Sequence, residues 1–144
     1  MASVFKNWIK KFLGLDRFEF ERVVVKQEVI DNICSFAKEN HPREFIMFLE
    51  GKAKDKVLRI RSLAFQEYAA NEDSASPKIY FPLNTDIAGS IHSHPGPSNR
   101  PSRADRHFFS KNGMFHMIIK EPYEQSDIQA YDKNGQPMSY EIED

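Results

Sequence analysis

Two histidines separated by one residue, His92 and His94, are the side chains in this sequence with the clearest capacity for chemistry. Side chains two positions apart on a β-strand point to the same face, so both imidazoles can face one point. Ser102 and Asp105 follow at the expected start of a helix, where residues three apart also share a face. Zinc accepts two imidazole nitrogens and one carboxylate oxygen in a tetrahedral site whose fourth position is open to water, which is typical of catalytic zinc. We therefore expect His92, His94 and Asp105 to bind one zinc ion, although manganese, iron and cobalt also fit such a donor set in vitro.

A hydrolytic zinc site also needs a group that transfers protons and is not itself a ligand. Glu44 is the candidate, because it stands at the start of the apolar run 45–49, directly after residues 41–43. Its carboxylate is expected to accept a proton from the metal-bound water and to return that proton to a leaving amine. Ser102 is expected to donate a hydrogen bond to the oxyanion of a tetrahedral intermediate. Together these groups describe metal-assisted hydrolysis of an amide bond.

The same residues also have structural interpretations. Ser102 and Asp105 form a pattern that caps helix N-termini without any metal, and Glu44 alone resembles an ordinary surface carboxylate. The sequence contains neither the helical H-E-x-x-H of other zinc proteases nor the H-x-E and P-C-x-x-C of zinc deaminases. The other residues of metal-ligating type with no paired spacing are assigned to structure, surface or core: His41, His107, His116 and Cys34.

Hydrophobic periodicity around these residues predicts a mixed α/β domain. Helices are predicted over residues 27–40 and 102–112; Pro42 ends the first and Gly113 the second. Strands are predicted at 23–25, 45–49, 57–60, 79–81, 87–92 and 114–119, the strand 45–49 being closed by Gly51. Residues 127–142 are predicted to form a terminal hairpin that turns at Asn134-Gly135.

The first seventeen residues are predicted to form a separate amphipathic helix before the domain at 18–144. Apolar residues recur there at helical spacing, and the first fifteen residues contain three lysines and no acid. Such a helix packs on its own domain, contacts a second copy in a homodimer, or contacts an acidic or membrane surface.

Composition sets limits on the class of protein. A chain of 144 residues suits one compact domain, and a formal net charge of -1 removes the main electrostatic reason to expect a nucleic-acid partner. The single cysteine excludes an internal disulfide framework. No apolar run approaches the roughly 20 residues that span a bilayer. We therefore expect a soluble cytoplasmic protein without a membrane span.

Glu44, the His92-x-His94 pair and Ser102-x-x-Asp105 together resemble the complete JAMM motif of the MPN-domain metallopeptidases. The flanking residues agree, because 89–95 read G-S-I-H-S-H-P and residues 42–44 read P-R-E. The resemblance covers about residues 18–144 and implies a single MPN domain with a mixed sheet flanked by helices. It also implies that His92, His94 and Asp105 are the zinc ligands, that Glu44 is the general acid/base and that Ser102 is the oxyanion donor.

The resemblance implies a substrate class as well. Members with all five positions hydrolyse isopeptide or peptide bonds at the C-terminal tail of ubiquitin or ubiquitin-like proteins. The compact size is most similar to prokaryotic and archaeal members, which act on small ubiquitin-like modifiers and sulfur carriers, so we expect such a protein and its conjugates as partners. Two alternatives stay open: a non-catalytic MPN module that scaffolds a larger assembly, and a zinc hydrolase of a small amide or peptide.

Two features bear on how a substrate would reach the site. The polar stretch 67–77 is predicted to be a long loop, either a flap that guides the modifier's tail or a passive surface loop. Many members of the family have glycine three residues after the glutamate, where this chain has Met47. The larger side chain is expected to crowd the strand beside the site.

Overall fold

The computed structural model describes residues 19–64 and 86–144. The predicted N-terminal helix, the loop 67–77 and the strand 79–81 lie outside the described residues. In chain order the elements are β1 (Arg22–Lys26), α2 (Gln27–Asn40), β2 (Ile46–Lys54), β3 (Val57–Ala64), β4 (Ile87–His94), α3 (Arg103–Lys111), β5 (Phe115–Lys120), the 3-10 turn η2 (Gln125–Asp127), β6 (Ile128–Tyr131), β7 (Pro137–Met138) and β8 (Glu141–Glu143). This arrangement confirms the predicted α/β architecture, with one mixed sheet and helices on both of its faces.

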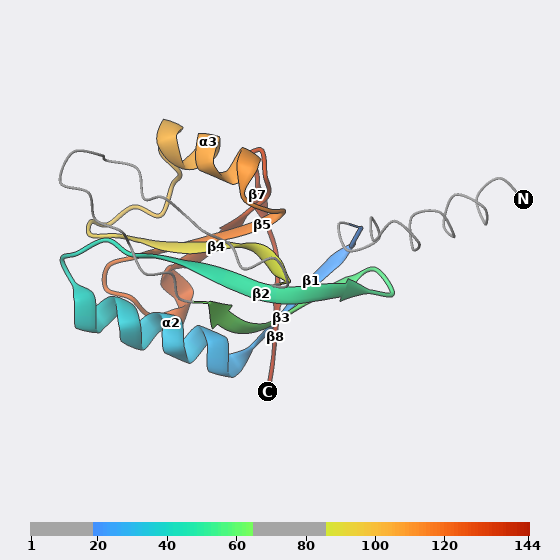
Figure 1. Cartoon of the computed structure of the whole chain (residues 1–144). Helices are drawn as coiled ribbons and strands as arrows, with labels where there is room; N and C mark the ends of the chain where they lie inside the picture. The colour runs from blue at the N-terminus through green and yellow to red at the C-terminus, as the bar shows by residue number, and fades with distance from the viewer. Residues whose placement is uncertain (1–18, 65–85) are drawn as a thin grey trace, which may run out of the picture.

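The sheet has eight strands in the order β7-β6-β5-β4-β2-β3-β1-β8. The pairs β4–β5, β1–β3 and β1–β8 are parallel, and the remaining pairs are antiparallel. In Figure 1, α2 lies below the sheet and α3 above it. β4 therefore lies in the middle of the sheet, and Phe109 of α3 packs against β5 and β6 and against the ring of His92 in β4.

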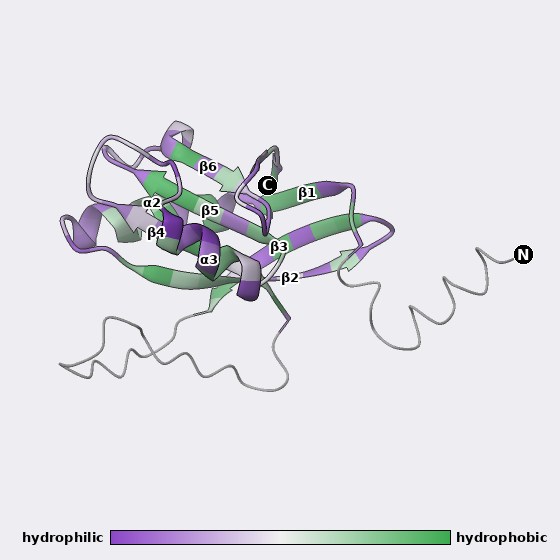
Figure 2. Cartoon of the chain, turned by 90° about the horizontal axis from the view of Figure 1, so that it is seen from above, coloured by the Kyte–Doolittle hydropathy of each residue, from purple (hydrophilic) through white to green (hydrophobic). Residues whose placement is uncertain are grey.

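The two faces of the sheet have separate cores. On the α2 side, the helix buries Val29, Ile30, Ile33 and Ala37 against inward-facing residues of most strands. On the α3 side, a smaller cluster consists of Phe109, Ile118 and Tyr131, with Phe108 packed against it. Alternation along each strand sends successive side chains to opposite faces, so a residue's position in β4 decides which core it joins. In Figure 2 the central strands are largely green, which marks hydrophobic residues, whereas α3 is largely purple, which marks hydrophilic residues.

The strand predicted to end at Gly51 is longer than expected. β2 continues to Lys54, and its pairing with β3 shifts between Glu50 and Gly51. A Cβ atom at Gly51 would lie 2.2 Å from the carbonyl oxygen of Arg59 on β3. The glycine therefore permits a close approach within a bulge, and reading it as the end of the strand was wrong.

The predicted terminal hairpin is only partly present. β6 and β7 pair in antiparallel fashion, as expected. The last strand, β8, instead pairs in parallel with β1 at the opposite edge of the sheet, where Glu141 lies beside Val24. Ion pairs of Arg22 with Glu141 and of Arg59 with Glu143 hold it there.

The longer of the two α-helices in the described ranges, α2, has 14 residues. Neither helix combines the length and the apolar character needed to cross a membrane.

Candidate metal centre

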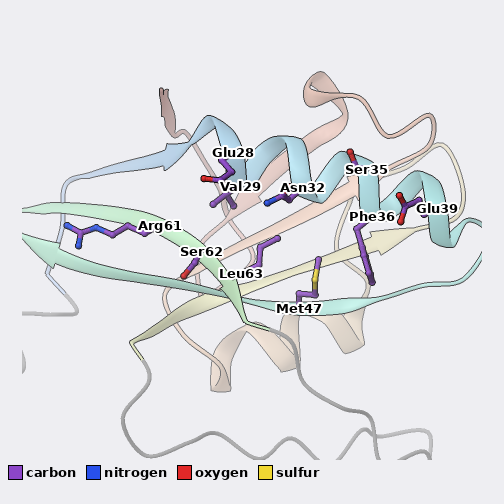
Figure 3. A pocket seen from close by; sticks show the side chains of 10 residues that line it. All are labelled: Glu28, Val29, Asn32, Ser35, Phe36, Glu39, Met47, Arg61, Ser62 and Leu63. Carbon is purple, nitrogen blue, oxygen red and sulfur yellow. The ribbon is translucent and has the colours of Figure 1, made fainter.

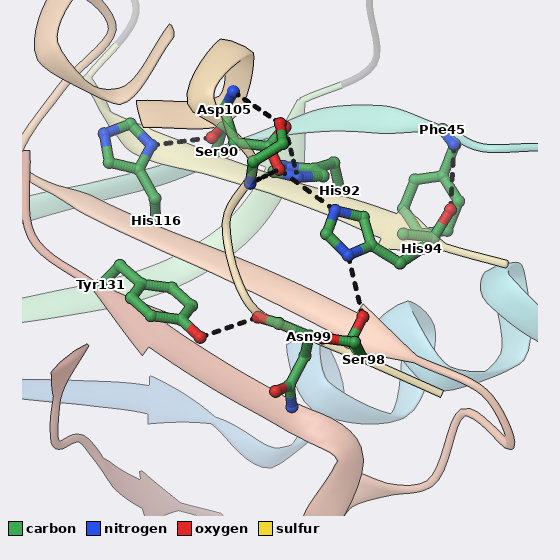
Figure 4. Close-up of polar contacts among 11 residues, drawn as sticks. Phe45, Ser90, His92, His94, Ser98, Asn99, Asp105, His116 and Tyr131 are labelled. Carbon is green, nitrogen blue, oxygen red and sulfur yellow. Dashed lines mark hydrogen bonds and ion pairs between the residues drawn. The ribbon is translucent and has the colours of Figure 1, made fainter. Parts of the chain in front are cut away.

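His92 and His94 at the end of β4 meet Asp105 in the first turn of α3 (Figure 4). One ligand-type atom from each of the three residues lies within 4.8 Å of the others. The two imidazole rings are 5.2 Å apart between centroids. These three residues are referred to below as the triad. The structure thus brings together the side chains that the sequence predicted to converge, although their role as ligands stays a prediction.

The start of α3 places Asp105 through a capping box. The hydroxyl of Ser102 accepts a hydrogen bond from the backbone N–H of Asp105 at 3.0 Å, and Oδ2 of Asp105 accepts one from the backbone N–H of Ser102 at 2.8 Å. The same carboxylate lies 3.1 Å from Nε2 of His92 through Oδ1 and 3.2 Å from Nε2 of His94 through Oδ2. Asp105 can therefore cap the helix and face the two histidines at the same time, so the capping role and the ligand role are compatible.

A backbone contact orients the ring of His94. Its Nδ1 lies 2.9 Å from the carbonyl oxygen of Ser98, which can only accept a hydrogen bond, so Nδ1 carries a proton. Nε2 is then the nitrogen that faces Asp105 and the interior of the triad. Such an outer hydrogen bond is a common way to fix the tautomer of a metal-binding histidine.

His92 shows that the donor set fits a metal ion. The residue is 6% exposed, and neither ring nitrogen makes a hydrogen bond to a described residue. Nε2 lies within ion-pair distance of Asp105 but without the alignment of a hydrogen bond. Buried polar atoms are normally satisfied, so a buried imidazole whose Nε2 faces a carboxylate without a hydrogen bond needs an explanation. A cation bound by the triad would supply the missing partner, and two imidazoles with one carboxylate suit zinc.

The electrostatics of the triad favour a bound cation. Burial alone would raise the pKa of Asp105, but the imidazoles of His92 and His94 hold it well below its usual range. The contact with Asp105 raises the pKa of His94, while burial opposes that shift. Asp105 therefore carries a negative charge in a half-buried position, where an opposite charge is strongly favoured.

Glu44 is exposed and lies two residues before the start of β2. Its neighbour Phe45 donates its backbone N–H to the hydroxyl of Ser93 at 3.0 Å, and the N–H of Ser93 donates to the carbonyl of Phe45 at 3.1 Å. Ser93 stands between the two histidines, so these bonds tie the segment of Glu44 to the end of β4. The pKa of His94 is raised mainly by its contact with Asp105. The negative charge of Glu44 makes a further, smaller contribution in the same direction. The predicted proton carrier therefore lies close enough for its charge to act on His94.

A second contact that holds the end of β4 in place is made by Tyr123, and the sequence did not predict it. This tyrosine is buried, and its hydroxyl lies 2.8 Å from Nδ1 of His41 and donates to the carbonyl oxygen of His94 at 3.4 Å. Tyr123 follows β5 in a loop, and no spacing in the sequence relates it to β4. Ser93 could have been found, since its place between two inward-facing imidazoles sends its side chain to the opposite side of the strand.

The remaining residues of ligand type do not join the triad. His116 is fully buried, with Nδ1 2.7 Å from the Ser90 hydroxyl and Nε2 3.1 Å from the carbonyl of Gly113. His107 is exposed on α3, and Cys34 is partly buried against the α2-side core. These placements agree with structural or surface roles.

Met47 does not crowd the metal centre. It is buried in the α2-side core, one residue beyond Ile46, which pairs with His92. Figure 3 shows its side chain directed towards α2, where it lines a cavity of about 420 Å³ between the helix and β3. Because Met47 and the triad face opposite sides of the sheet, the departure from the family pattern leaves the triad unobstructed.

Comparison with known proteins identifies relatives for most of the chain. The model of a family described as prokaryotic homologs of the JAB domain matches residues 26–133. A probable metalloprotease from Haloferax volcanii is 29% identical over 136 residues, which span 86% of this chain and 81% of that protein.

Two solved structures share the fold. A JAB1/MPN domain protein from Archaeoglobus fulgidus superposes with a TM-score of 0.65 at 27% identity, over 86% of this chain and 99% of that one. A structure described as JAMM, a metalloprotease-like zinc site in the proteasome and signalosome, gives a TM-score of 0.65 at 27% identity, over 86% and 100% of the two chains. The segment matched by the family model includes Glu44, β4 and the start of α3.

Proposed function

This chain belongs to the family of prokaryotic homologs of the JAB domain, and on that premise we propose that it is a zinc-dependent metallopeptidase of the JAMM type. Its proposed substrates are amide bonds that follow the C-terminal tail of a ubiquitin-like modifier or of a sulfur-carrier protein. Both isopeptide and peptide bonds belong to this class. One zinc ion per chain is part of the proposal.

The convergence of His92, His94 and Asp105 carries this proposal. Three ligand-type atoms lie within 4.8 Å of one another, and the buried imidazole of His92 makes no hydrogen bond within the described part of the chain. A purely structural site would satisfy these nitrogens with protein donors or acceptors, as Ser90 and Gly113 do for His116. The relative named as a probable metalloprotease and the neighbour named as a metalloprotease-like zinc site support the same chemistry.

The residues of the chain divide the chemical work. Zinc in such a donor set supplies a Lewis acid that polarises a carbonyl group and lowers the pKa of water. His92, His94 and Asp105 would hold the ion. Glu44 would accept a proton from the attacking water and deliver it to the leaving amine.

Ser102 would stabilise the negative charge that develops on the carbonyl oxygen. Its hydroxyl oxygen accepts a hydrogen bond from the N–H of Asp105. The hydroxyl proton is not donated to any of the described residues, so it is available to the substrate. Capping the helix and donating to the substrate are therefore compatible roles, because they use different atoms of one hydroxyl group.

The substrate class is supported by the complete set of five motif positions, since members that hold all five cleave after modifier tails. Sulfur-carrier proteins have the same kind of tail, so they form part of one substrate class with the modifiers.

The test is cleavage of a ubiquitin-like modifier joined through its C-terminal carboxyl group to a lysine of a carrier protein. Glu44→Gln should retain one zinc per chain by elemental analysis and lower kcat about 10²- to 10⁴-fold, the usual contribution of a general acid/base. Glu21→Gln is the matched control. It removes an exposed carboxylate that pairs with Lys56 and lies just before β1, away from β4 in the sheet order, and should cleave at the wild-type rate.

Two results would contradict the proposal. Cleavage by Glu44→Gln at the wild-type rate would remove this residue from the mechanism. Wild-type protein with less than one zinc per chain and no cleavage of modifier conjugates would instead favour a scaffolding module.

A further inference from the structure

The outer face of α3 is basic. Arg103, Arg106 and Lys111 are exposed and lie on one side of the helix, since positions three, five and eight residues apart fall within a single arc of its surface. Arg100 is exposed in the loop that leads into the helix. These four residues are called the α3 basic face. Phe109, on the other side of α3, packs on the sheet and fixes the direction in which the basic face points.

The α3 basic face brings together four cations that make no ion pair with a described residue. Six other cations pair with carboxylates, in Arg22–Glu141, Lys38–Glu124, Lys52–Asp86, Lys56–Glu21, Arg59–Glu143 and Lys120–Asp127. Five exposed cations outside the α3 basic face are also without an ion pair to a described residue, but they are scattered along the chain: Lys26, Arg43, Lys54, Arg61 and Lys133. Among the residues described, no ion pair involves any of the four cations of the α3 basic face. The one acid between residues 95 and 113 is Asp105, whose carboxylate is already shared by the triad and the helix cap.

Two of the arginines are held on a fixed frame. The hydroxyl of Tyr131 donates to the carbonyl of Asn99 at 2.7 Å, which anchors the loop next to Arg100. The aliphatic part of Arg106 lies over Gly135, where a Cβ atom would come within 2.9 Å of it. Burial raises the pKa of Tyr131 while the charges of Arg100 and Arg106 oppose that shift, so both guanidinium groups lie near this hydroxyl.

The start of α3 carries residues of both the metal centre and the α3 basic face. Ser102 and Asp105 alternate along the chain with Arg100, Arg103 and Arg106 at the start of α3. A polypeptide whose amide bond lies at the triad would therefore present its neighbouring residues to these arginines. Uncompensated charges beside a site raise the local concentration of oppositely charged substrates and speed their association.

We propose that the α3 basic face is a docking surface for an acidic stretch of polypeptide that flanks the scissile bond, and that it selects substrates by charge. This inference rests on the proposed function and adds a substrate preference to it. Polypeptide is favoured over nucleic acid because the triad suits amide hydrolysis. In addition, four cations in a chain of net charge -1 provide few contacts for a phosphate backbone.

The experiment compares three modifier fusions that differ only beside the scissile bond, where the flank is acidic, neutral or rich in lysine. The flank is placed in turn on each side of the bond. The wild-type protein should prefer the acidic flank to the lysine flank by about tenfold or more in kcat/KM, mainly through KM, and high salt should reduce that preference. The double variant Arg103→Glu/Arg106→Glu should reverse the order and prefer the lysine flank. A change in folding alone would not reverse the order.

The matched control is Lys26→Glu/Lys54→Glu, which changes the net charge by the same amount at two exposed positions outside the α3 basic face. It should keep the wild-type preference. Zinc content and the midpoint of urea unfolding, measured for both double variants, verify that each is folded.

The outcomes separate this inference from the proposed function. If the wild-type protein cleaves all three fusions at equal kcat/KM, the charge preference is wrong and the proposed function stands. If it cleaves none of them, both fail. If duplex DNA inhibits cleavage of the acidic fusion more strongly than a polyglutamate peptide of equal charge, the surface recognises phosphate and the inference is overturned.

Discussion

The two faces of the central sheet are built from the same strands yet organised for different purposes. The α2 face holds a continuous apolar core in which four residues of one helix pack on most strands. The α3 face holds a small apolar cluster beside buried polar residues, namely Ser90, His92 and His116. The buried polar residues of the α3 face stabilise the fold only where they have a polar partner, as His116 and Ser90 do. His92 makes no hydrogen bond to a described residue, so we infer that stability comes mainly from the α2 face and that the metal centre depends mainly on the α3 face.

The largest effect expected from this comparison is that of His92→Ala on the α3 face. The variant should lose zinc binding and reduce cleavage to the level of the wild-type protein treated with a chelator. The urea unfolding free energy of its metal-free form should fall less than that of Ile33→Ala, because the removed imidazole has no hydrogen bond to lose. A variant that kept stoichiometric zinc would contradict the assignment of this residue as a ligand.

The counterpart on the α2 face is Ile33→Ala, which removes a fully buried side chain of the helix. Its free energy of unfolding should fall by about 2–5 kcal/mol, the usual range for such truncations. Zinc affinity and kcat of the folded fraction should stay close to wild type. Similar losses of zinc affinity in this variant and in His92→Ala would show that the two faces are not independent.

A smaller effect is expected from acid, through His116. Burial lowers the pKa of His116 to about 4, so the folded protein keeps the ring neutral at a pH where the unfolded chain is already protonated. Stability from this source is present above about pH 6.5 and is lost as the pH falls towards 4. Between pH 7 and pH 5, the unfolding free energy of the metal-free protein should fall by about 2 kcal/mol more than that of His116→Gln. Equal pH dependence of the two proteins would remove His116 as the cause.

The smallest expected effect is that of Tyr123→Phe, where a core residue of the α2 side reaches the metal centre through its hydroxyl. Loss of the contacts with His41 and the His94 carbonyl should lower kcat about fivefold, equivalent to about 1 kcal/mol. Tyr140→Phe, whose ring packs on Phe115 in the same core, is the control and should leave kcat unchanged. Equal kcat values for both variants would show that Tyr123 has no positioning role.

The predictable parts of this molecule are those that depend on local spacing. The helix 27–40 was predicted with the bounds that the structure gives to α2, because its apolar residues recur with helical period and Pro42 follows. The convergence of His92, His94 and Asp105 was also predicted, since alternation on a strand and the first turn of a helix determine where each side chain points.

The parts that could not be predicted depend on contacts between distant segments. Residues 141–143 are too short a strand to specify a partner, and only the exposed edge of β1 decides their position. Gly51 was predicted to end its strand. Its close approach to Arg59 depends on the pairing of β2 with β3, which the local sequence does not show. The contact of Tyr123 with the His94 carbonyl joins the loop after β5 to the end of β4, and no periodicity in the sequence predicts that contact.

The capping box at the start of α3 has a consequence for comparisons between sequences. Ser102 and Asp105 would still cap the N-terminus of α3 in a related domain that had lost its histidines. Substitution of either residue would therefore still destabilise the helix. His92 has no such structural role, because its ring makes no hydrogen bond to a described residue. In a survey of related sequences, we therefore expect the serine and aspartate to persist in inactive copies, and the first histidine to be the more faithful marker of a working enzyme.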